Sequence, residues 1–445
     1  PRFDLLSIKA YASMSIQYSR GCPFNCEFCD VWQIYGRAPR IKSAENMIAE
    51  LNALDQLGWR GALFVVDDNF IGNKPHVKNH LLPAFTQWQK MRQYPYRFYT
   101  EASVNLAEDD ELLSNMKKAG FNSVFLGIET PSEKSLQETG KLQNIKSSMI
   151  DAIKKIQSYS IEVMGGFIVG FDSDDETIFD RQINFIQKTA IPKAMVGLLH
   201  AVPGTTLYAR LKKENRILTD IFSGSNTHAL ETNFIPKMDP KVLKNGYGRL
   251  LDFLYGQRLK NYFKRCNQLL DNLGDSSLFQ RDIHLAEIVM FFKSLFLQTF
   301  SRYGFQYIRF IMRNFFKNHQ FFGEAVRMGI EGNHFYVITR QMLKADKFST
   351  MLEEKYQLIA KKLNIYSVAI SSASTDKMND LINLWQVKKE TFDVMKNKIC
   401  TMPIEFREGV LRQYSEMDKN LRKLFRTCQA DLIRRGFKFK IAVKF

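Results

Sequence analysis

The sequence predicts an α/β fold: a partial (β/α)6 TIM-like barrel followed by a mainly helical C-terminal domain. Two observations support this prediction. Short apolar segments alternate with helical patterns about six times over the first 205 or so residues, and polar residues suited to chemistry directly follow most of these segments. Such alternation implies a parallel sheet with helices outside it, either an open doubly wound sheet or an incomplete barrel.

The predicted strands are short and apolar, and each ends in a polar or glycine-containing turn. They cover residues 14–19, 62–66, 97–101, 123–128, 162–170 and 195–201. Helical patterns lie between them over residues 43–57, 110–119, 145–159 and 176–188.

The positions of the reactive residues favour the barrel, because active sites of β/α barrels gather at the carboxyl ends of the strands. The residues that follow the first five strands in turn are a cysteine cluster, Asp67-Asp68-Asn69, Glu101, Glu129 and Asp172. Six strands rather than eight predict a barrel with an open side for a large substrate.

The pattern becomes helical and rich in Phe, Lys and Arg after Pro203-Gly204-Thr205, with breaks near residues 222–227 and 371–375. A length of 445 residues also favours two domains over one. We therefore predict a barrel over residues 1–218 and a helical domain over residues 219–445.

The positive charge belongs to the second half. Residues 1–220 have a net charge of about +1, so about +16 of the formal +17 falls on residues 221–445. An anionic substrate, nucleic acid and an acidic lipid surface are the candidate partners, and a solubilising surface charge is the alternative.

The chain is predicted to be soluble. No segment approaches the roughly 18 to 20 uncharged apolar residues that a membrane-spanning helix needs, since charged residues interrupt the most apolar stretch, 286–322. The chain opens with Pro1 and has no signal peptide, so we expect it to be a piece of a longer protein.

Three of the six cysteines, Cys22, Cys26 and Cys29, lie within eight positions. In a chain without secretory features, this clustering indicates metal or redox chemistry in a reducing cytoplasm. Iron–sulfur cubanes normally take four cysteines, so three would leave one iron open, as in a catalytic centre. A structural zinc site with a distant fourth ligand is the alternative, and His76 and His80 are better explained as surface residues.

The motif Cys22-x-x-x-Cys26-x-x-Cys29, preceded by a strand and Arg-Gly, resembles the signature of radical S-adenosylmethionine (SAM) enzymes. The resemblance implies a [4Fe-4S] cluster on the three cysteines, with SAM bound to the open iron. Reductive cleavage of SAM would give a 5′-deoxyadenosyl radical that removes hydrogen from a substrate carbon. An external electron donor such as flavodoxin or ferredoxin is implied as well.

The resemblance also implies a set of SAM-binding residues, each with a structural alternative such as a core position, a helix cap or a strand bulge. Phe28 and the strand residues Gly166, Ile168 and Gly170 would contact the adenine. Asp67, Asp68 and Asn69 would bind the methionine amino group. Glu101, Ser103 and Glu129 would contact the ribose and the methionyl end.

The sequences of residues 15–17, 67–73 and 162–166 resemble those of one subgroup. It comprises the radical SAM proteins with an N-terminal cobalamin-binding domain, which include the hopanoid C-2 methylase. This resemblance continues to residues 232–237, but the cobalamin domain is absent from this chain. With such a domain upstream, we expect methyl transfer from methylcobalamin to a carbon of a lipid-like or other small substrate.

Two features of the basic half leave the partner open. A predicted helix over residues 302–322 places Arg302, Arg309 and Arg313 on one face and apolar residues on another. It would either pack into the core or lie on an anionic membrane surface. Residues 407–435 add more Lys and Arg without a recognised nucleic-acid motif. A radical tRNA-modifying enzyme and a non-catalytic protein whose cysteines hold a structural metal are therefore kept as alternatives.

Overall fold

The computed structural model describes residues 1–219, 231–274, 285–369 and 375–434. It divides into two compact units, Pro1–Val337 and Ile338–Phe445. The domain boundary predicted at 218/219 lies within the first unit and stays a prediction. The break predicted near 222–227 lies outside the described residues, as does all but the last residue of the break near 371–375.

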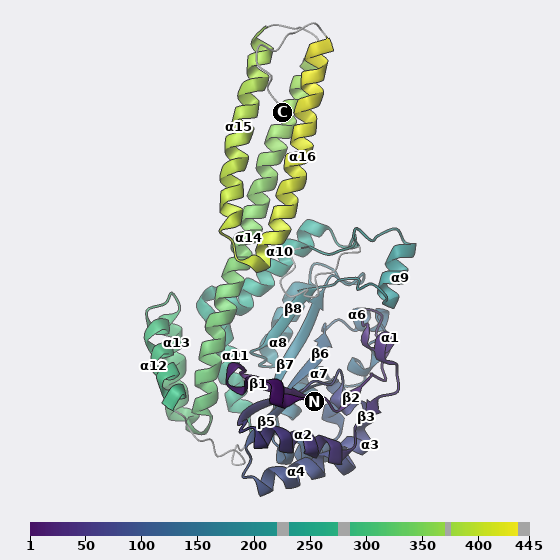
Figure 1. Ribbon diagram of the computed structural model, residues 1–445, viewed down its shortest axis with the longest axis vertical. Helices are drawn as coiled ribbons and strands as arrows, with labels where there is room; N and C mark the ends of the chain where they lie inside the picture. The colour runs from purple at the N-terminus through teal and green to yellow at the C-terminus, as the bar shows by residue number, and fades with distance from the viewer. Residues whose placement is uncertain (220–230, 275–284, 370–374, 435–445) are drawn as a thin grey trace. The chain divides into compact units, whose positions relative to one another are not determined.

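The first unit contains a six-stranded parallel sheet (Figure 1). Its strands are β1 (Ser13–Ile16), β4 (Gly61–Val65), β5 (Tyr96–Ala102), β6 (Phe121–Glu129), β7 (Glu162–Val169) and β8 (Ala194–Leu198). They follow one another in chain order across the sheet, and every neighbouring pair is parallel. A doubly wound sheet would reverse its strand order at one point. The predicted partial barrel is therefore confirmed, with β1 and β8 at its edges.

A second, two-stranded sheet joins β2 (Ser19–Arg20) to β3 (Arg40–Ile41) in antiparallel register. The chain between these strands contains the three clustered cysteines. This pairing therefore fixes both ends of the cysteine loop.

Helices accompany the barrel strands, and most of them begin at a side-chain cap. They are α1 (Val31–Tyr35), α2 (Ala44–Gln56), α3 (Lys74–His76), α4 (Leu82–Met91), α5 (Asp110–Ala119), α6 (Glu133–Glu138), α7 (Met149–Ser158), α8 (Ile178–Lys188) and α9 (Thr206–Lys213). The side chains of Ser43 and Ser148 accept hydrogen bonds from backbone N–H groups in the first turns of α2 and α7. All four predicted helices are present, as α2, α5, α7 and α8, and the ranges predicted do not include α1, α3, α4 or α6.

The chain after the barrel adds helices that remain in the first unit. They are α10 (Pro240–Leu251), α11 (Lys260–Asn272), α12 (Leu285–Thr299), α13 (Gly304–Lys317) and the first part of α14 (Phe322–Ala369). Polar groups attach α10, α11 and the turn between them to β8 and the segment before it. The Tyr255 hydroxyl bonds to both backbone groups of Ala194 at 2.8 Å, and the buried Arg265 donates to Ile191 O at 2.9 Å. These buried bonds make the helices an extension of the barrel.

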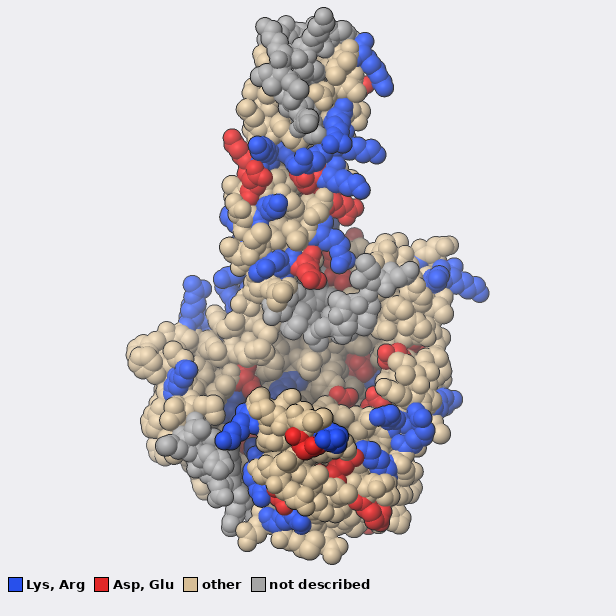
Figure 2. All heavy atoms as spheres, viewed as in Figure 1, with Lys and Arg blue, Asp and Glu red and all other residues tan. Residues whose placement is uncertain are grey.

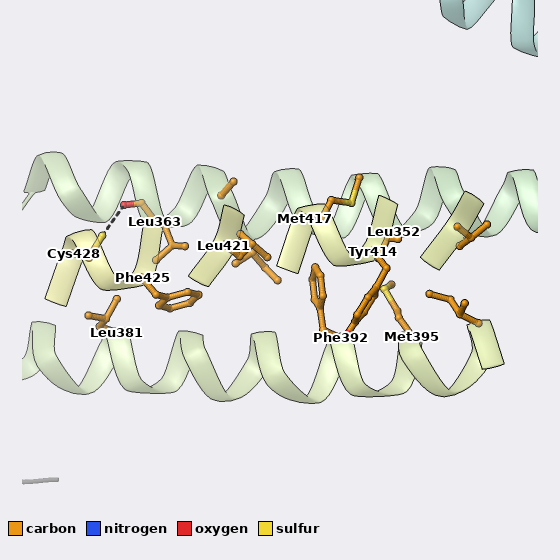
Figure 3. Close-up of a cluster of buried hydrophobic side chains, with 14 of the residues drawn as sticks. Leu352, Leu363, Leu381, Phe392, Met395, Tyr414, Met417, Leu421, Phe425 and Cys428 are labelled. Carbon is orange, nitrogen blue, oxygen red and sulfur yellow. Dashed lines mark hydrogen bonds between the residues drawn. The ribbon is translucent and has the colours of Figure 1, made fainter. Parts of the chain in front are cut away.

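The second unit consists of the rest of α14, α15 (Thr375–Cys400) and α16 (Ile404–Arg434). Its core is a row of buried apolar side chains from all three helices (Figure 3). They include Leu352, Leu363, Leu381, Phe392, Met395, Tyr414, Met417, Leu421, Phe425 and Cys428. On the face drawn in Figure 2, Lys and Arg side chains of this unit are interspersed with Asp and Glu. The predicted mainly helical character is confirmed, and no helix among the described residues is long and apolar enough to span a membrane.

Candidate active site

The cysteine loop is a tight turn held by backbone contacts. The N–H of Cys22 donates to Gly36 O at 3.3 Å, and Gly21 has φ +105°, where a Cβ would lie 2.9 Å from that same oxygen. Only glycine tolerates both demands. All three cysteines are free thiols, Cys26 buried and the other two half-buried.

Side-chain amides approach two of the sulfur atoms. Asn69 Nδ2 lies 3.8 Å from Cys22 Sγ, and Gln143 Nε2 lies 3.9 Å from Cys26 Sγ. Burial raises the pKa of Cys29 to about 11 and also raises the pKa of Cys26. Amide donors favour the thiolate, which is the form that binds metal.

Asp67 and Asp68 follow β4 but have different surroundings. Asp67 is buried and accepts hydrogen bonds from the backbone N–H groups of Tyr18 and Ser19, both at 2.8 Å, and from the Ser19 hydroxyl at 2.6 Å. Burial raises its pKa to about 6, although these bonds favour the ionised form. Its carboxylate therefore positions the start of the cysteine loop.

Asp68 and Asn69 present unused oxygen atoms instead. Among the described residues, buried Asp68 Oδ2 and Asn69 Oδ1 have no hydrogen-bond partner. Burial also raises the pKa of Asp68. Since unpaired buried acceptors are costly, this pair fits a ligand that donates hydrogen bonds.

Glu101 lies near Asp68, at the carboxyl end of β5. Burial, with a smaller contribution from the charge of Asp68, raises the pKa of Glu101 to about 7. Ser103 is buried two residues later, and its hydroxyl donates to Asn105 Oδ1 at 2.6 Å. The carboxyl-terminal edge of the sheet, which we call the rim, thus brings the carboxyl groups of Asp68 and Glu101 together. The Ser103 hydroxyl proton is instead used in the hydrogen bond to Asn105.

Glu129 ends β6 and forms a buried ion pair with Lys141. A register shift between β6 and β7 and a φ of +64° at Glu129 turn its side chain to this partner. Gly127 makes room, because a Cβ there would lie 2.7 Å from both Glu129 Oε1 and Lys141 Nζ. Burial would lower the pKa of Lys141, but the charges of Glu129 and Cys26 raise it. Lys141 was not predicted, and it adds a positive charge next to the cysteines.

Two of the predicted adenine contacts share one apolar cluster. Phe28 and Ile168 both pack against a core that includes Phe171, and the Phe28 and Phe171 ring centroids are 6.0 Å apart. The Ile168 carbonyl accepts a hydrogen bond from Gln182 Nε2 at 2.7 Å. Only Ile168 and Phe28 of this set therefore offer apolar side chains at the site.

Gly166 on β7 and Gly170, which directly follows β7, have different roles. A Cβ at Gly166 would lie 3.0 Å from the Phe125 ring, so glycine there allows β6 and β7 to pack closely. Gly170 has φ +103°, and its N–H donates to Asp174 Oδ2 at 2.9 Å. Its backbone donor is thus used within the chain.

Asp172, which also follows β7, belongs to an ion-pair network. Arg210 and Arg216 donate to its carboxylate at 2.6 to 2.9 Å. Burial would raise its pKa, but hydrogen bonds from Arg216 and Arg210 lower it to about 2. Arg210 also donates to Glu27 in the cysteine loop at 2.6 Å. Arg210 therefore links the cysteine loop to α9, and Asp172 helps to hold Arg210 in place.

His76 and His80 lie together; His80 is exposed, as a surface residue should be, whereas His76 is half-buried. The rings of His76 and His80 are 4.8 Å apart, and His76 Nδ1 lies 2.7 Å from the Tyr18 hydroxyl. Within the described ranges, no three His, Cys, Asp or Glu side chains converge closely enough to hold a single metal ion. A cubane cluster is wider than one ion, so its cysteines need not converge on one point.

The comparison with protein families agrees with this geometry. The family described as "Radical SAM superfamily" matches residues 16–181, which include the cysteine loop and β1 to β7. This chain carries a radical SAM domain. A second family, "Domain of unknown function (DUF4070)", matches residues 205–347. Members of the radical SAM superfamily are enzymes that use a [4Fe-4S] cluster and SAM, so the non-catalytic alternative is set aside.

Two curated relatives of this chain have names that describe methylation. An uncharacterized methyltransferase of Synechocystis is 48% identical over 60% of this chain and 49% of its own length. The hopanoid C-2 methylase of Rhodopseudomonas palustris is 39% identical over 52% of this chain and 44% of its own length. The chain thus spans about half the length of the curated relatives it matches.

Solved structures show a weaker similarity. The radical SAM methyltransferase TsrM of Kitasatospora setae, with cobalamin and a [4Fe-4S] cluster bound, has a TM-score of 0.45 at 12% identity, covering 72% of this chain and 61% of that chain. OxsB, a cobalamin-dependent radical SAM enzyme, scores 0.35 at 15% identity over 96% of this chain and 56% of its own. At such scores neither similarity supports a functional conclusion.

The residues present fit the two groups that the radical SAM domain uses. Three free thiols share one loop, and amides approach two of them. The unpartnered oxygens of Asp68 and Asn69 suit the ammonium of an amino acid. Asp67 and Asp172 were singled out for this rim, but the structure gives both carboxylates partners within the chain.

The first prediction concerns SAM binding. We expect Asp68→Asn and Glu129→Gln each to weaken SAM binding about tenfold or more, because each removes a charge beside the expected ligand. Equilibrium binding on the anaerobic protein measures this, with iron content unchanged. The exposed Asp175→Asn serves as the matched control. Unchanged affinity in both variants would remove these carboxylates from the site.

The second prediction concerns pH and Glu101. Because the folded-state pKa of about 7 exceeds the unfolded value of 4.5, the folded chain binds the extra proton between these values. Stability therefore falls as pH rises through this window. We expect the thermal midpoint of the chain without SAM to fall more between pH 5 and pH 8 than that of Glu101→Gln. The exposed Glu133→Gln should follow the unmodified protein, and parallel profiles for all three would contradict the assignment.

Proposed function

We propose that this chain is the catalytic part of a radical SAM methylase that acts on a lipid-like or other small-molecule substrate. The observation that supports it is one arrangement of residues. Three free cysteines lie in a loop clamped by β2 and β3, next to the unpartnered oxygens of Asp68 and Asn69.

In this proposal Cys22, Cys26 and Cys29 hold the [4Fe-4S] cluster, while Asp68 and Asn69 hold the amino group of SAM. When bound, the cluster and SAM would supply a carbon radical that takes a hydrogen atom from the substrate. The chain itself binds and orients the cluster, SAM and the substrate, and it excludes water from them.

Three neighbours of the cysteine loop would assist. Gln143 aims an amide at Cys26, which favours its thiolate. Lys141 offsets negative charge at the cysteines and holds Glu129 in place. Phe28 offers an apolar surface for the adenine, with the Lys141 ammonium 5.8 Å from its ring centroid. Gln143 and Lys141 do not belong to any recognised sequence motif, so the sequence alone could not have indicated their place beside the cysteines.

We propose methyl transfer because two relatives of this chain are named as a methyltransferase and a methylase. Methylation by this route needs a methyl carrier, so we propose methylcobalamin held by a domain outside the present chain. We further propose an external one-electron donor such as flavodoxin or ferredoxin. Two further parts of the proposal are a cytoplasmic location and peripheral contact with a membrane, where a lipid-like substrate would be found.

The cleavage of SAM tests the enzyme directly. We expect the anaerobically reconstituted protein with a chemical reductant to form 5′-deoxyadenosine from SAM, and Cys26→Ala to form none, because it leaves only two thiolates in the loop. Cys400→Ala, at an exposed cysteine outside the loop, is the matched control and should retain the activity. Equal product from Cys26→Ala and the unmodified protein would refute the proposed function.

A further inference from the structure

The helices α12 and α13 form a hairpin within the first unit (Figure 1). Its turn is tight, because a Cβ at Gly304 would lie 1.9 Å from Thr299 O. The Ser294 hydroxyl meets the Tyr307 hydroxyl at 3.1 Å between the helices. The hairpin is therefore a defined structural element.

One side of α13 is fixed to α11. The Phe310 ring stacks on Phe263 with centroids 4.7 Å apart, and Asn314 Nδ2 donates to Asn267 Oδ1 at 2.8 Å. This confirms part of the core-packing alternative for the helix predicted over residues 302–322. It accounts for only one of the apolar faces of α13.

The hairpin leaves many large apolar side chains in water. They are Ile288, Val289, Met290, Phe292, Phe296, Leu297, Phe300, Phe305, Met312, Phe315 and Phe316, which we call the hairpin apolar face. Phe300 in the turn is 79% exposed and Phe305 beside it is 76% exposed. Single exposed apolar residues are ordinary, but a concentration of this size on one element indicates a binding surface.

Ring contacts connect the two helices of this face. Phe292 contacts Phe291, Phe291 contacts Phe322, Phe322 contacts Phe315 and Phe315 contacts Phe316, with successive centroids 5.3 to 5.8 Å apart. The exposed Phe292 of α12 and Phe315 of α13 are thus linked through the half-buried rings of Phe291 and of Phe322, which begins α14. In Figure 2 the region of α12 and α13 is mainly tan on the face drawn.

The hairpin is strongly basic, and Glu287 at the start of α12 is its single acidic residue in the sequence. Between Ile288 and Lys317 the sequence contains no Asp or Glu and five cations, namely Lys293, Arg302, Arg309, Arg313 and Lys317. Arg313 and Lys317 pair with Asp271 of α11. Among the described residues, the other three have no carboxylate partner. The free charge beside the apolar face is therefore positive.

We propose that this hairpin docks on an anionic lipid surface, with Phe300, Phe305 and their apolar neighbours entering the interface and Lys293, Arg302 and Arg309 contacting the headgroups. Aromatic residues with Lys and Arg are the combination that binds such surfaces. A second copy would bring the same cations face to face, which disfavours self-association. The inference rests on the membrane contact proposed above and specifies its surface.

The test is co-sedimentation of the 445-residue chain with vesicles. We expect binding to vesicles of phosphatidylglycerol and phosphatidylcholine, with at least about tenfold weaker partitioning to phosphatidylcholine alone and a decrease with salt. Phe300→Ser with Phe305→Ser should lower partitioning about tenfold. Arg302→Gln with Arg309→Gln should reduce binding to the anionic vesicles only.

Met91→Ser is the matched control, because Met91 on α4 is 66% exposed and lies outside the hairpin. It should bind as the unmodified protein does, and circular dichroism should show every variant folded. Absence of binding to the anionic vesicles would overturn the inference, as would an equal loss in Met91→Ser. A dimer in sedimentation velocity that Phe305→Ser dissociates, without vesicle binding, would assign the face to a second copy instead and overturn it.

The two proposals fail separately. Formation of 5′-deoxyadenosine is measured without vesicles, and vesicle binding is measured without reductant. A chain that binds vesicles but forms no 5′-deoxyadenosine would keep the docking surface and refute the enzyme. A chain with the opposite behaviour would keep the enzyme and refute the docking surface.

Discussion

The whole site depends on how the short cysteine loop is held. Its start is fixed by the buried Asp67 carboxylate, which accepts three hydrogen bonds from Tyr18 and Ser19. Its two ends are joined by the β2–β3 pairing, and its middle is tied to α9 through Glu27 and Arg210. These constraints hold the backbone of the loop that carries the three thiols. A preformed loop of this kind reduces the ordering cost of binding a cluster.

The sheet then determines what surrounds the loop. Parallel strands in chain order place all their carboxyl ends on one rim. Asp68 after β4, Glu101 on β5 and Glu129 on β6 reach that rim from successive strands. Burial raises the pKa of the first two, and Lys141 compensates the third. The rim thus gathers three carboxyl groups, and a cationic ligand would favour the ionised form of the two that have no cation beside them among the described residues.

The sequence predicted the parts of this site that depend on local spacing. The cysteine motif, the strand order and the positions of the rim residues follow from short-range patterns, and the structure confirms the barrel. It did not distinguish Asp67 from Asp68, because the hydrogen bonds that engage Asp67 come from Tyr18 and Ser19, which are distant in the sequence. Nor did it indicate Lys141, whose pairing with Glu129 depends on a left-handed backbone and on the missing Cβ of Gly127. Such contacts between distant residues leave no periodic signal.

In the chain after the barrel, too, the sequence predicted the local structure but not the contacts between distant residues. Its helical character was predictable from periodicity, but the attachment of Tyr255 and Arg265 to β8 and the segment before it was not. The exposure of Phe300 and Phe305 was also hidden, since an apolar helical face in sequence is most often a buried one.

The central claim is that three cysteines hold a cubane cluster with one iron left for SAM. Iron and sulfide analysis of the anaerobically purified protein, with electron paramagnetic resonance of its reduced form, tests this most directly. The account predicts about four iron and four sulfide per chain and a spectrum that changes when SAM is added. One zinc ion without sulfide, or a cluster spectrum that SAM leaves unaltered, would contradict it.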